Sequence, residues 1–166
     1  MAKIKSDNFT DTTIIGDPTL TFPRAPLNFA ADFRIKSDSG KEVVLINTTS
    51  PLGAVEKARI SYSEIANVYS GSGIDASIMA PTKQGVSILA QLTDVITVTD
   101  DVAADYRIDL PISCHLVVKI PASEHIIAAD VQSRIGRLLS CLFDTGVETT
   151  SRLEAILRGS LVPSDV

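Results

Sequence analysis

Cys114 and His115 stand side by side, at the one place in the sequence where a thiol adjoins an imidazole. Such a pair can form a nucleophilic thiolate or bind a metal ion. The stretch around it alternates as a strand does, so the two side chains are expected on opposite faces. No third ligand stands at a suitable spacing. The pair therefore predicts neither a catalytic site nor a metal site, and Cys114 is expected to be buried as a small apolar residue, as is Cys141.

The acidic residues Asp100, Asp101 and Asp105 are a second group that could do chemistry, as paired carboxylates. No nucleophile or base accompanies them, and we expect them in a loop between two strands. The sequence also has no glycine-rich phosphate loop, no defensible catalytic triad and no HExxH motif. It predicts a protein that is not an enzyme and that uses no cofactor.

The strand that positions His115 is the clearest element. From Arg107 to Ile120 every even position is apolar and most odd positions are polar, which predicts a long strand with one face towards a core. An N-terminal hairpin is predicted in residues 1–23, around the turn signal Gly16-Asp17-Pro18. Further strands are predicted over Glu42–Ser50, Lys57–Ile65, Ile74–Pro81 and Leu92–Asp100.

The period changes after Pro121, where apolar residues recur at helical spacing. They are Val131, Ile135, Leu138, Leu139 and Leu142. A short second helix is predicted to begin with the capping-box pattern of Ser151 and Glu154 and to close at Gly159.

Strands followed by helices predict an α+β fold. We expect an antiparallel sheet of about five strands with one apolar and one polar face. One domain is expected over residues 1–166, with the hairpin in 1–23, the main sheet in 41–121 and two C-terminal helices in 126–161. The polar face would carry Lys57, Arg59, His115 and Lys119. From the residues alone, these side chains fit a merely solvated sheet face as well as a binding site.

The composition limits the classes of partner. Of 166 residues, 45% are hydrophobic and the formal net charge is −5, which argues against binding nucleic acid by bulk charge but leaves room for a local basic face. Two cysteines do not make a disulfide framework. No secretory signal and no membrane span is found. We expect a soluble protein of a reducing compartment.

Several stretches together resemble the coat proteins of the single-stranded RNA bacteriophages, the levivirus type. They are "DNFTDTT…PTLTFPR", "GKEVVLINTTSPLGAVEKARISYS", "IDASIMAP", "ISCHLVVKIP" and "VQSRIGRLLSCLF…LEAILRGSL". The resemblance covers most of the chain and lies in order, spacing and length, not in one diagnostic motif. The segment Arg24–Asp38 has no clear counterpart.

The resemblance implies an assembly. In this family, two chains pair their sheets edge to edge, and the two C-terminal helices of each chain lie across the partner's sheet. The dimers close into an icosahedral shell of about 180 subunits. The implied location is the virion, assembled in the cytoplasm of the bacterial host, with a phage maturation protein as a further partner.

The resemblance also implies that the polar face binds a hairpin of the phage RNA, which represses replicase translation and marks the genome for packaging. The RNA-binding candidates that it places on this face are Lys57, Arg59, Ser61, Ser63, Asp75, Ser77, Ser113 and His115. Ser113 aligns where well-studied members carry a Tyr that stacks on a base, an interaction of about 1–3 kcal/mol, and Asp75 would repel phosphate. General phosphate contact through Lys57 and Arg59 is therefore the expected mode.

Two alternatives remain open from the sequence. One is a small cytoplasmic oligomeric α+β module that binds a ligand on the open sheet face. The other is an enzyme of unknown reaction that uses His115.

Overall fold

The computed structural model describes residues 27–75, 77, 82–99, 106–143 and 151–161. The chain divides into two compact units, one made of residues 24–122 and the other of residues 1–23 with 123–166. The predicted N-terminal hairpin and the predicted acidic loop at Asp100–Asp105 lie outside the described residues. Whether the two units form the single domain expected from the sequence stays a prediction.

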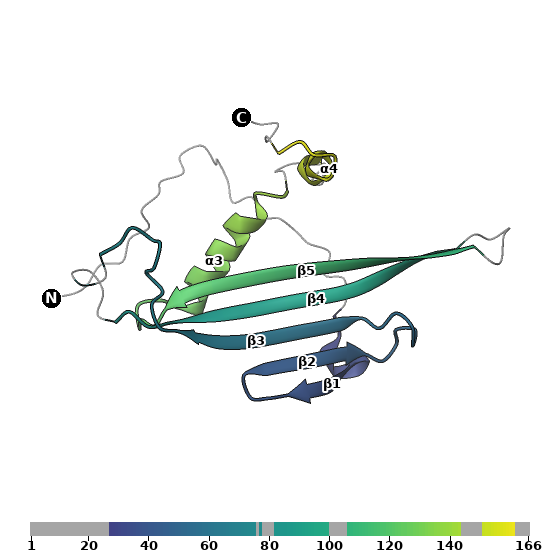
Figure 1. Ribbon diagram of the computed structural model, residues 1–166, viewed down its shortest axis with the longest axis horizontal. Helices are drawn as coiled ribbons and strands as arrows, with labels where there is room; N and C mark the ends of the chain where they lie inside the picture. Colours follow the sequence, from purple (N-terminus) through teal and green to yellow (C-terminus); the bar gives the residue numbers. More distant parts are fainter. Residues whose placement is uncertain (1–26, 76, 78–81, 100–105, 144–150, 162–166) are drawn as a thin grey trace. The chain divides into compact units, whose positions relative to one another are not determined.

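One antiparallel sheet of five strands forms the unit of residues 24–122, in the order β1-β2-β3-β4-β5 (Figure 1). Each strand pairs with its neighbour in sequence. The strands are β1 (Phe33–Asp38), β2 (Glu42–Asn47), β3 (Lys57–Ile65), β4 (Gly85–Thr99) and β5 (Arg107–Pro121). The predicted α+β fold with an antiparallel sheet of about five strands is confirmed.

The segment that the sequence could not place supplies the short helix α1 (Phe29–Asp32) and strand β1. The turn from β1 to β2 forms because the Asp38 carboxylate accepts a hydrogen bond from the Gly40 backbone N at 2.8 Å. Gly40 has a φ of +76°, which suits glycine best. The sheet therefore begins at Phe33 rather than at residue 41.

The strand predicted over Ile74–Pro81 is wrong at its described residues Ile74, Asp75 and Ser77, because none of them lies in a strand. The Asp75 carboxylate accepts hydrogen bonds from the Ser77 backbone N at 2.9 Å and from its hydroxyl at 2.5 Å. Local bonding of this kind competes with strand pairing. The next strand, β4, instead begins at Gly85, earlier than the predicted Leu92.

The far ends of β4 and β5 form a two-stranded arm. The pairing of β3 with β4 stops at Thr93, whereas β4 and β5 stay paired as far as Thr99 and Arg107. The two strands accordingly extend past the other three (Figure 1). We call residues 94–99 and 107–112 the β4–β5 arm.

Little of the sheet is buried within the chain. Among the described residues, only Phe33, Ala54, Ala58 and Gly85 are buried. The prediction that Cys114 lies in a core is wrong for the single chain, since Cys114 is exposed and its apolar neighbour Ile112 is 45% exposed. The physical reason is that, among the described residues of this unit, this part of β5 is paired with β4 alone.

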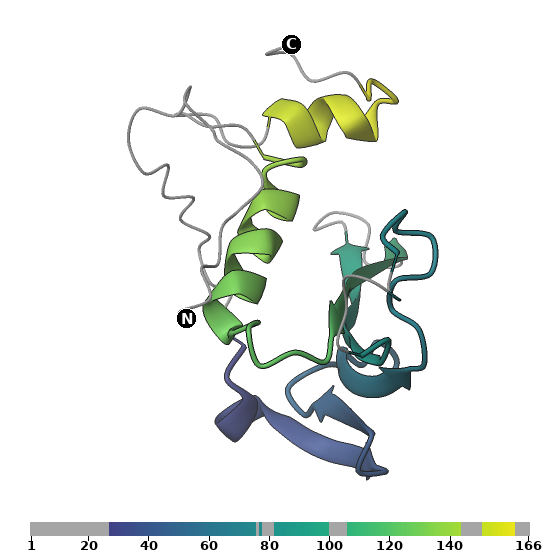
Figure 2. The ribbon, with the colours of Figure 1, turned by 90° about the vertical axis from the view of Figure 1, so that its left-hand side faces the viewer.

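The described part of the second unit contains two helices, α3 (Ala128–Leu139) and α4 (Ser151–Leu157), as predicted (Figure 2). The Asp130 carboxylate accepts a hydrogen bond from the Ile127 backbone N at 2.9 Å and thereby caps the start of α3. Gly159, with a φ of +89°, ends α4 as expected.

The C-terminal end of α3 differs from the prediction in one respect. The helix ends at Leu139, so Cys141 and Leu142 lie in the turn that follows it, and Cys141 is exposed rather than buried. Arg152 of α4 donates a hydrogen bond to the Ser140 carbonyl oxygen in this turn, at 2.5 Å.

Candidate functional site

The candidate binding residues gather on one face of the sheet because the three longest strands place them in register. Arg59 of β3 lies opposite Gln91 of β4, which lies opposite His115 of β5. Alternation brings their neighbours to the same side. We call this surface the polar sheet face; it consists of Lys57, Arg59, Ser61, Ser63, Ser87, Gln91, Thr93, Ser113, His115 and Lys119.

Six of the eight predicted site residues belong to the polar sheet face, and two do not. The six are Lys57, Arg59, Ser61, Ser63, Ser113 and His115. Asp75 and Ser77 lie in the connection between β3 and β4, and their expected place on a strand beside the other candidates is wrong. The hydrogen bonds from Ser77 lower the pKa of the Asp75 carboxyl, which keeps a negative charge at this exposed position.

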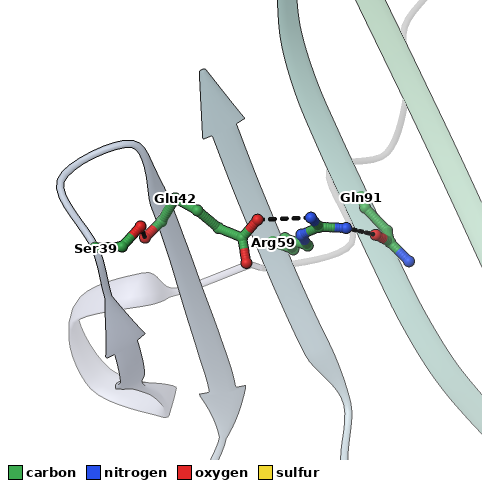
Figure 3. A network of polar contacts seen from close by, with 4 residues as sticks. All are labelled: Ser39, Glu42, Arg59 and Gln91. Atoms are coloured by element: carbon green, nitrogen blue, oxygen red, sulfur yellow. Dashed lines mark hydrogen bonds and ion pairs between the residues drawn. The ribbon is translucent and has the colours of Figure 1, made fainter. Parts of the chain in front are cut away.

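A row of polar contacts crosses the polar sheet face at Arg59 (Figure 3). One terminal nitrogen of Arg59, Nη2, lies 2.6 Å from the Glu42 carboxylate oxygen Oε2 in β2. The other, Nη1, donates to Gln91 Oε1 at 3.5 Å. The Arg59 Nε atom is buried and has no hydrogen-bond partner among the described residues. The guanidinium group therefore lies across the sheet, and the Arg59 side chain is only partly exposed.

Hydroxyl groups and the imidazole continue the row across β4 and β5. The Gln91 amide donates to Thr93 Oγ1 at 3.4 Å, and Thr93 Oγ1 lies 3.5 Å from Ser113 Oγ. Ser113 Oγ is 2.8 Å from His115 Nε2. Ser113 and His115 are both exposed, so they remain accessible to a ligand. A surface of neutral donors and acceptors suits hydrogen bonding to nucleotides better than the attraction of bulk charge.

Positive charge is present on both sides of this row. Lys57 and Lys119 are exposed, and neither makes an ion pair with a residue in the described ranges. Lys57 lies on β3 opposite Thr93, and Lys119 lies on β5 opposite Ser87. These two ammonium groups can contact phosphate without losing an internal partner.

Sequence reasoning missed three members of the polar sheet face, Ser87, Gln91 and Thr93. The first two belong to the part of β4 that the sequence did not predict as strand. In "GVSILAQLT" apolar residues interrupt the alternation, and Leu89 indeed lies on the polar side, opposite Ser61. The alternate positions from Gln91 to Thr99 are polar except at Val95, and this pattern was the signal that could have found the strand's face.

The structure separates the side chains of Cys114 and His115. Cys114 lies opposite Leu92, one register position from the Gln91 and His115 pair, so the two side chains belong to opposite faces. In the described part of the chain, no group of three or more His, Cys, Asp or Glu residues could hold a metal ion. Among the same residues, no helix has the length and apolar character to cross a membrane.

No model of a protein family matches this chain, and neither does any curated protein. Solved structures do match it. A chain of the virus-like particle of bacteriophage AVE015 is 29% identical, with a TM-score of 0.86, over 99% of this chain and 100% of that one. A chain of the virus-like particle of bacteriophage GQ-112 is 18% identical, with a TM-score of 0.78, over 96% of this chain and 97% of that one. The likeness to bacteriophage coat proteins that the sequence predicts is therefore confirmed over nearly the whole chain.

Proposed function

We propose that this chain, which has the fold of the bacteriophage coat proteins, is the shell subunit of a single-stranded RNA phage. The observation that carries the proposal is the match to the chain of the bacteriophage AVE015 particle, which extends over the full length of both chains. The proposed role is structural: the chain dimerises, assembles into a closed shell and packages RNA on the polar sheet face. From the same resemblance to the coat proteins of RNA phages, we expect a shell of about 180 copies. We also expect a phage maturation protein as a partner and assembly in the host cytoplasm.

Dimerisation is supported by apolar surface that the single chain leaves open. On the apolar side of the β4–β5 arm, Ile96, Leu110 and Ile112 are each 45–48% exposed. On α3, Leu138 is also exposed. The chain thus exposes an apolar sheet face and an apolar stripe on a helix. A second copy could bury both surfaces in one symmetric contact.

The two edge strands of the sheet differ in how readily they can pair with a strand of a second chain. β5 is an edge strand of 15 residues, whereas β1, at the other edge, has six residues and a register shift between Ile35 and Ser37. Short, irregular and charged edges resist pairing with another chain, and long regular edges favour it. We therefore place the edge-to-edge contact of the dimer at β5.

RNA binding is supported by the chemistry of the polar sheet face. Lys57 and Lys119 provide charge for phosphate, and the central row provides hydroxyl, amide and imidazole groups for nucleotides. Repression of replicase translation through an RNA hairpin would use the same face.

The RNA proposal is tested by the nucleic acid content of the full-length chain purified from bacteria. We expect a large assembly whose excess absorbance at 260 nm resists nuclease while the assembly is intact and disappears once it is dissociated. A small oligomer free of nucleic acid would contradict the proposal and favour a ligand-binding module.

A further inference from the structure

Glu42 occupies a defined position at the edge of the polar sheet face. It is the first residue of β2 and directly follows the turn closed by Gly40. Its backbone carbonyl oxygen accepts a hydrogen bond from the Ser39 backbone N at 2.9 Å. The turn therefore fixes where the Glu42 side chain leaves the sheet, and from there its carboxylate reaches Arg59 (Figure 3).

The contact between Glu42 and Arg59 cancels the charge at the centre of the face. The pair is close, at 2.6 Å, and both side chains are only partly exposed, 36% for Glu42 and 43% for Arg59. A carboxylate at this distance offsets the potential of the guanidinium group at any phosphate nearby. The Nη1 atom of Arg59 is directed to Gln91, so Arg59 is held as a positioning donor within the sheet.

We propose that Glu42 limits the phosphate attraction of the polar sheet face by pairing with Arg59, so that charge acts only at Lys57 and Lys119. This inference rests on the proposed RNA function and adds a regulating residue to it. The centre of the face then contributes hydrogen bonds that depend little on salt, and the two lysines supply the salt-dependent part of binding.

A functional reason for this arrangement lies in reversibility. A shell subunit that binds RNA through many phosphate contacts holds any RNA tightly, since each contact adds to affinity regardless of sequence. An internal carboxylate that pairs with one cation lowers the number of cations available to phosphate and so weakens this general attraction. The row of neutral groups can then discriminate between RNA sequences. Glu42 thus affects selectivity without touching RNA itself.

The test is the variant Glu42→Gln, which keeps the shape of the side chain and removes its charge. Binding of a short polyuridine oligonucleotide to the full-length chain, dissociated from any particle, is measured over a series of salt concentrations. We expect the slope of log affinity against log salt to steepen by about 0.7, the contribution of one freed cation to single-strand binding. Affinity at low salt should rise about two- to fivefold.

Three further variants make the result specific. Glu42→Asp, which keeps the charge, should restore the shallower slope. Arg59→Ala combined with Glu42→Gln should abolish the gain, because no guanidinium is left to be freed. Glu64→Gln, a matched loss of one negative charge on the opposite face of β3, should leave the slope unchanged. Circular dichroism of each variant shows that the fold is kept.

The outcomes separate this inference from the proposed function. Wild-type chain that binds polyuridine with a slope equal to that of Glu42→Gln would overturn the role of Glu42 and leave RNA binding intact. Equal steepening by Glu64→Gln would reduce the effect to net charge and also overturn it. A folded wild-type chain that binds no RNA at any salt concentration would instead overturn the proposed function.

Discussion

Gly85 shows at the scale of a single residue how closely the chain packs where β4 begins. A Cβ added there would lie 2.6 Å from the Ile120 carbonyl oxygen in β5 and 2.8 Å from the Val68 Cβ. Both distances are shorter than real contacts, and the first is to backbone, which cannot move aside. The absence of a side chain at Gly85 is therefore what lets β5 and the connection after β3 approach β4 at this end of the sheet.

We predict that Gly85→Ala destabilises the subunit by about 1–3 kcal/mol, the usual effect of overpacking. Chemical denaturation followed by circular dichroism measures the change. Gly53→Ala is the matched control, because a Cβ there meets nothing within 4 Å, and it should change stability by less than about 0.5 kcal/mol. Equal stability of Gly85→Ala and wild type would show that the close approach is absent in solution.

Lys57 is a residue whose ammonium group we expect to contact an RNA phosphate directly. Lys57→Ala should make the slope of log affinity against log salt shallower by about 0.7, since one phosphate contact is lost. Lys83→Ala removes the same charge from an exposed position between β3 and β4, outside the polar sheet face. If both variants changed the slope equally, the assignment of RNA to this face would fail.

At the scale of elements, the β4–β5 arm is stabilised by a cluster of three residues on its polar side. Asp109 accepts a hydrogen bond from the Thr97 hydroxyl at 2.6 Å and from Arg107 Nε at 3.1 Å. These contacts, Thr97 first, lower the pKa of the Asp109 carboxyl below its ordinary value of 3.8. The folded chain then binds this proton more weakly than the unfolded chain, so stabilisation by Asp109 is complete above the ordinary pKa.

That stabilisation is lost as the pH falls through the lowered pKa of Asp109. The difference in melting temperature between the wild type and Asp109→Asn should therefore shrink when the pH drops from about 5 to about 2. Thr97→Val should weaken the same dependence. A difference that stays constant over this range would show that the contacts of Asp109 do not form.

The elements also show what the sequence could predict. β3 and β5 were predicted closely because each alternates over most of its length, a pattern that can be recognised without knowledge of its partners. β4 was predicted only from Leu92, because Leu89 departs from the alternation. The alternation from Ile74 was misleading, since the Asp75 side chain bonds locally to Ser77. Residues of the candidate site were predicted only where their strand was predicted. Gln91 was missed because its part of β4 was missed.

The contact between Glu42 and Arg59 could not be predicted, because it depends on the register between strands. Glu42 lies opposite Ser61, which makes Arg59 its diagonal neighbour. A shift by one residue would direct the Glu42 carboxylate to the other face. Alternation assigns a residue to a face but does not identify its neighbour across the strand pair.

At the scale of the whole molecule, the proposed second copy would cover the exposed apolar residues. Leu138 of α3 is 53% exposed in the single chain, and the proposed dimer buries it. We predict that Leu138→Lys weakens dimerisation about 30-fold or more, equivalent to about 2 kcal/mol at a buried contact. Gln132→Lys, on an exposed position of the same helix, is the control and should dimerise normally in analytical ultracentrifugation. Unchanged dimerisation of Leu138→Lys would place the interface elsewhere.

The proposal that this chain is a shell subunit is tested most directly by electron microscopy of the purified full-length protein. We predict closed, uniform particles with density for RNA lining the inner surface, against the polar sheet face. A population of small oligomers that never assembles, at any protein or salt concentration tried, would contradict it.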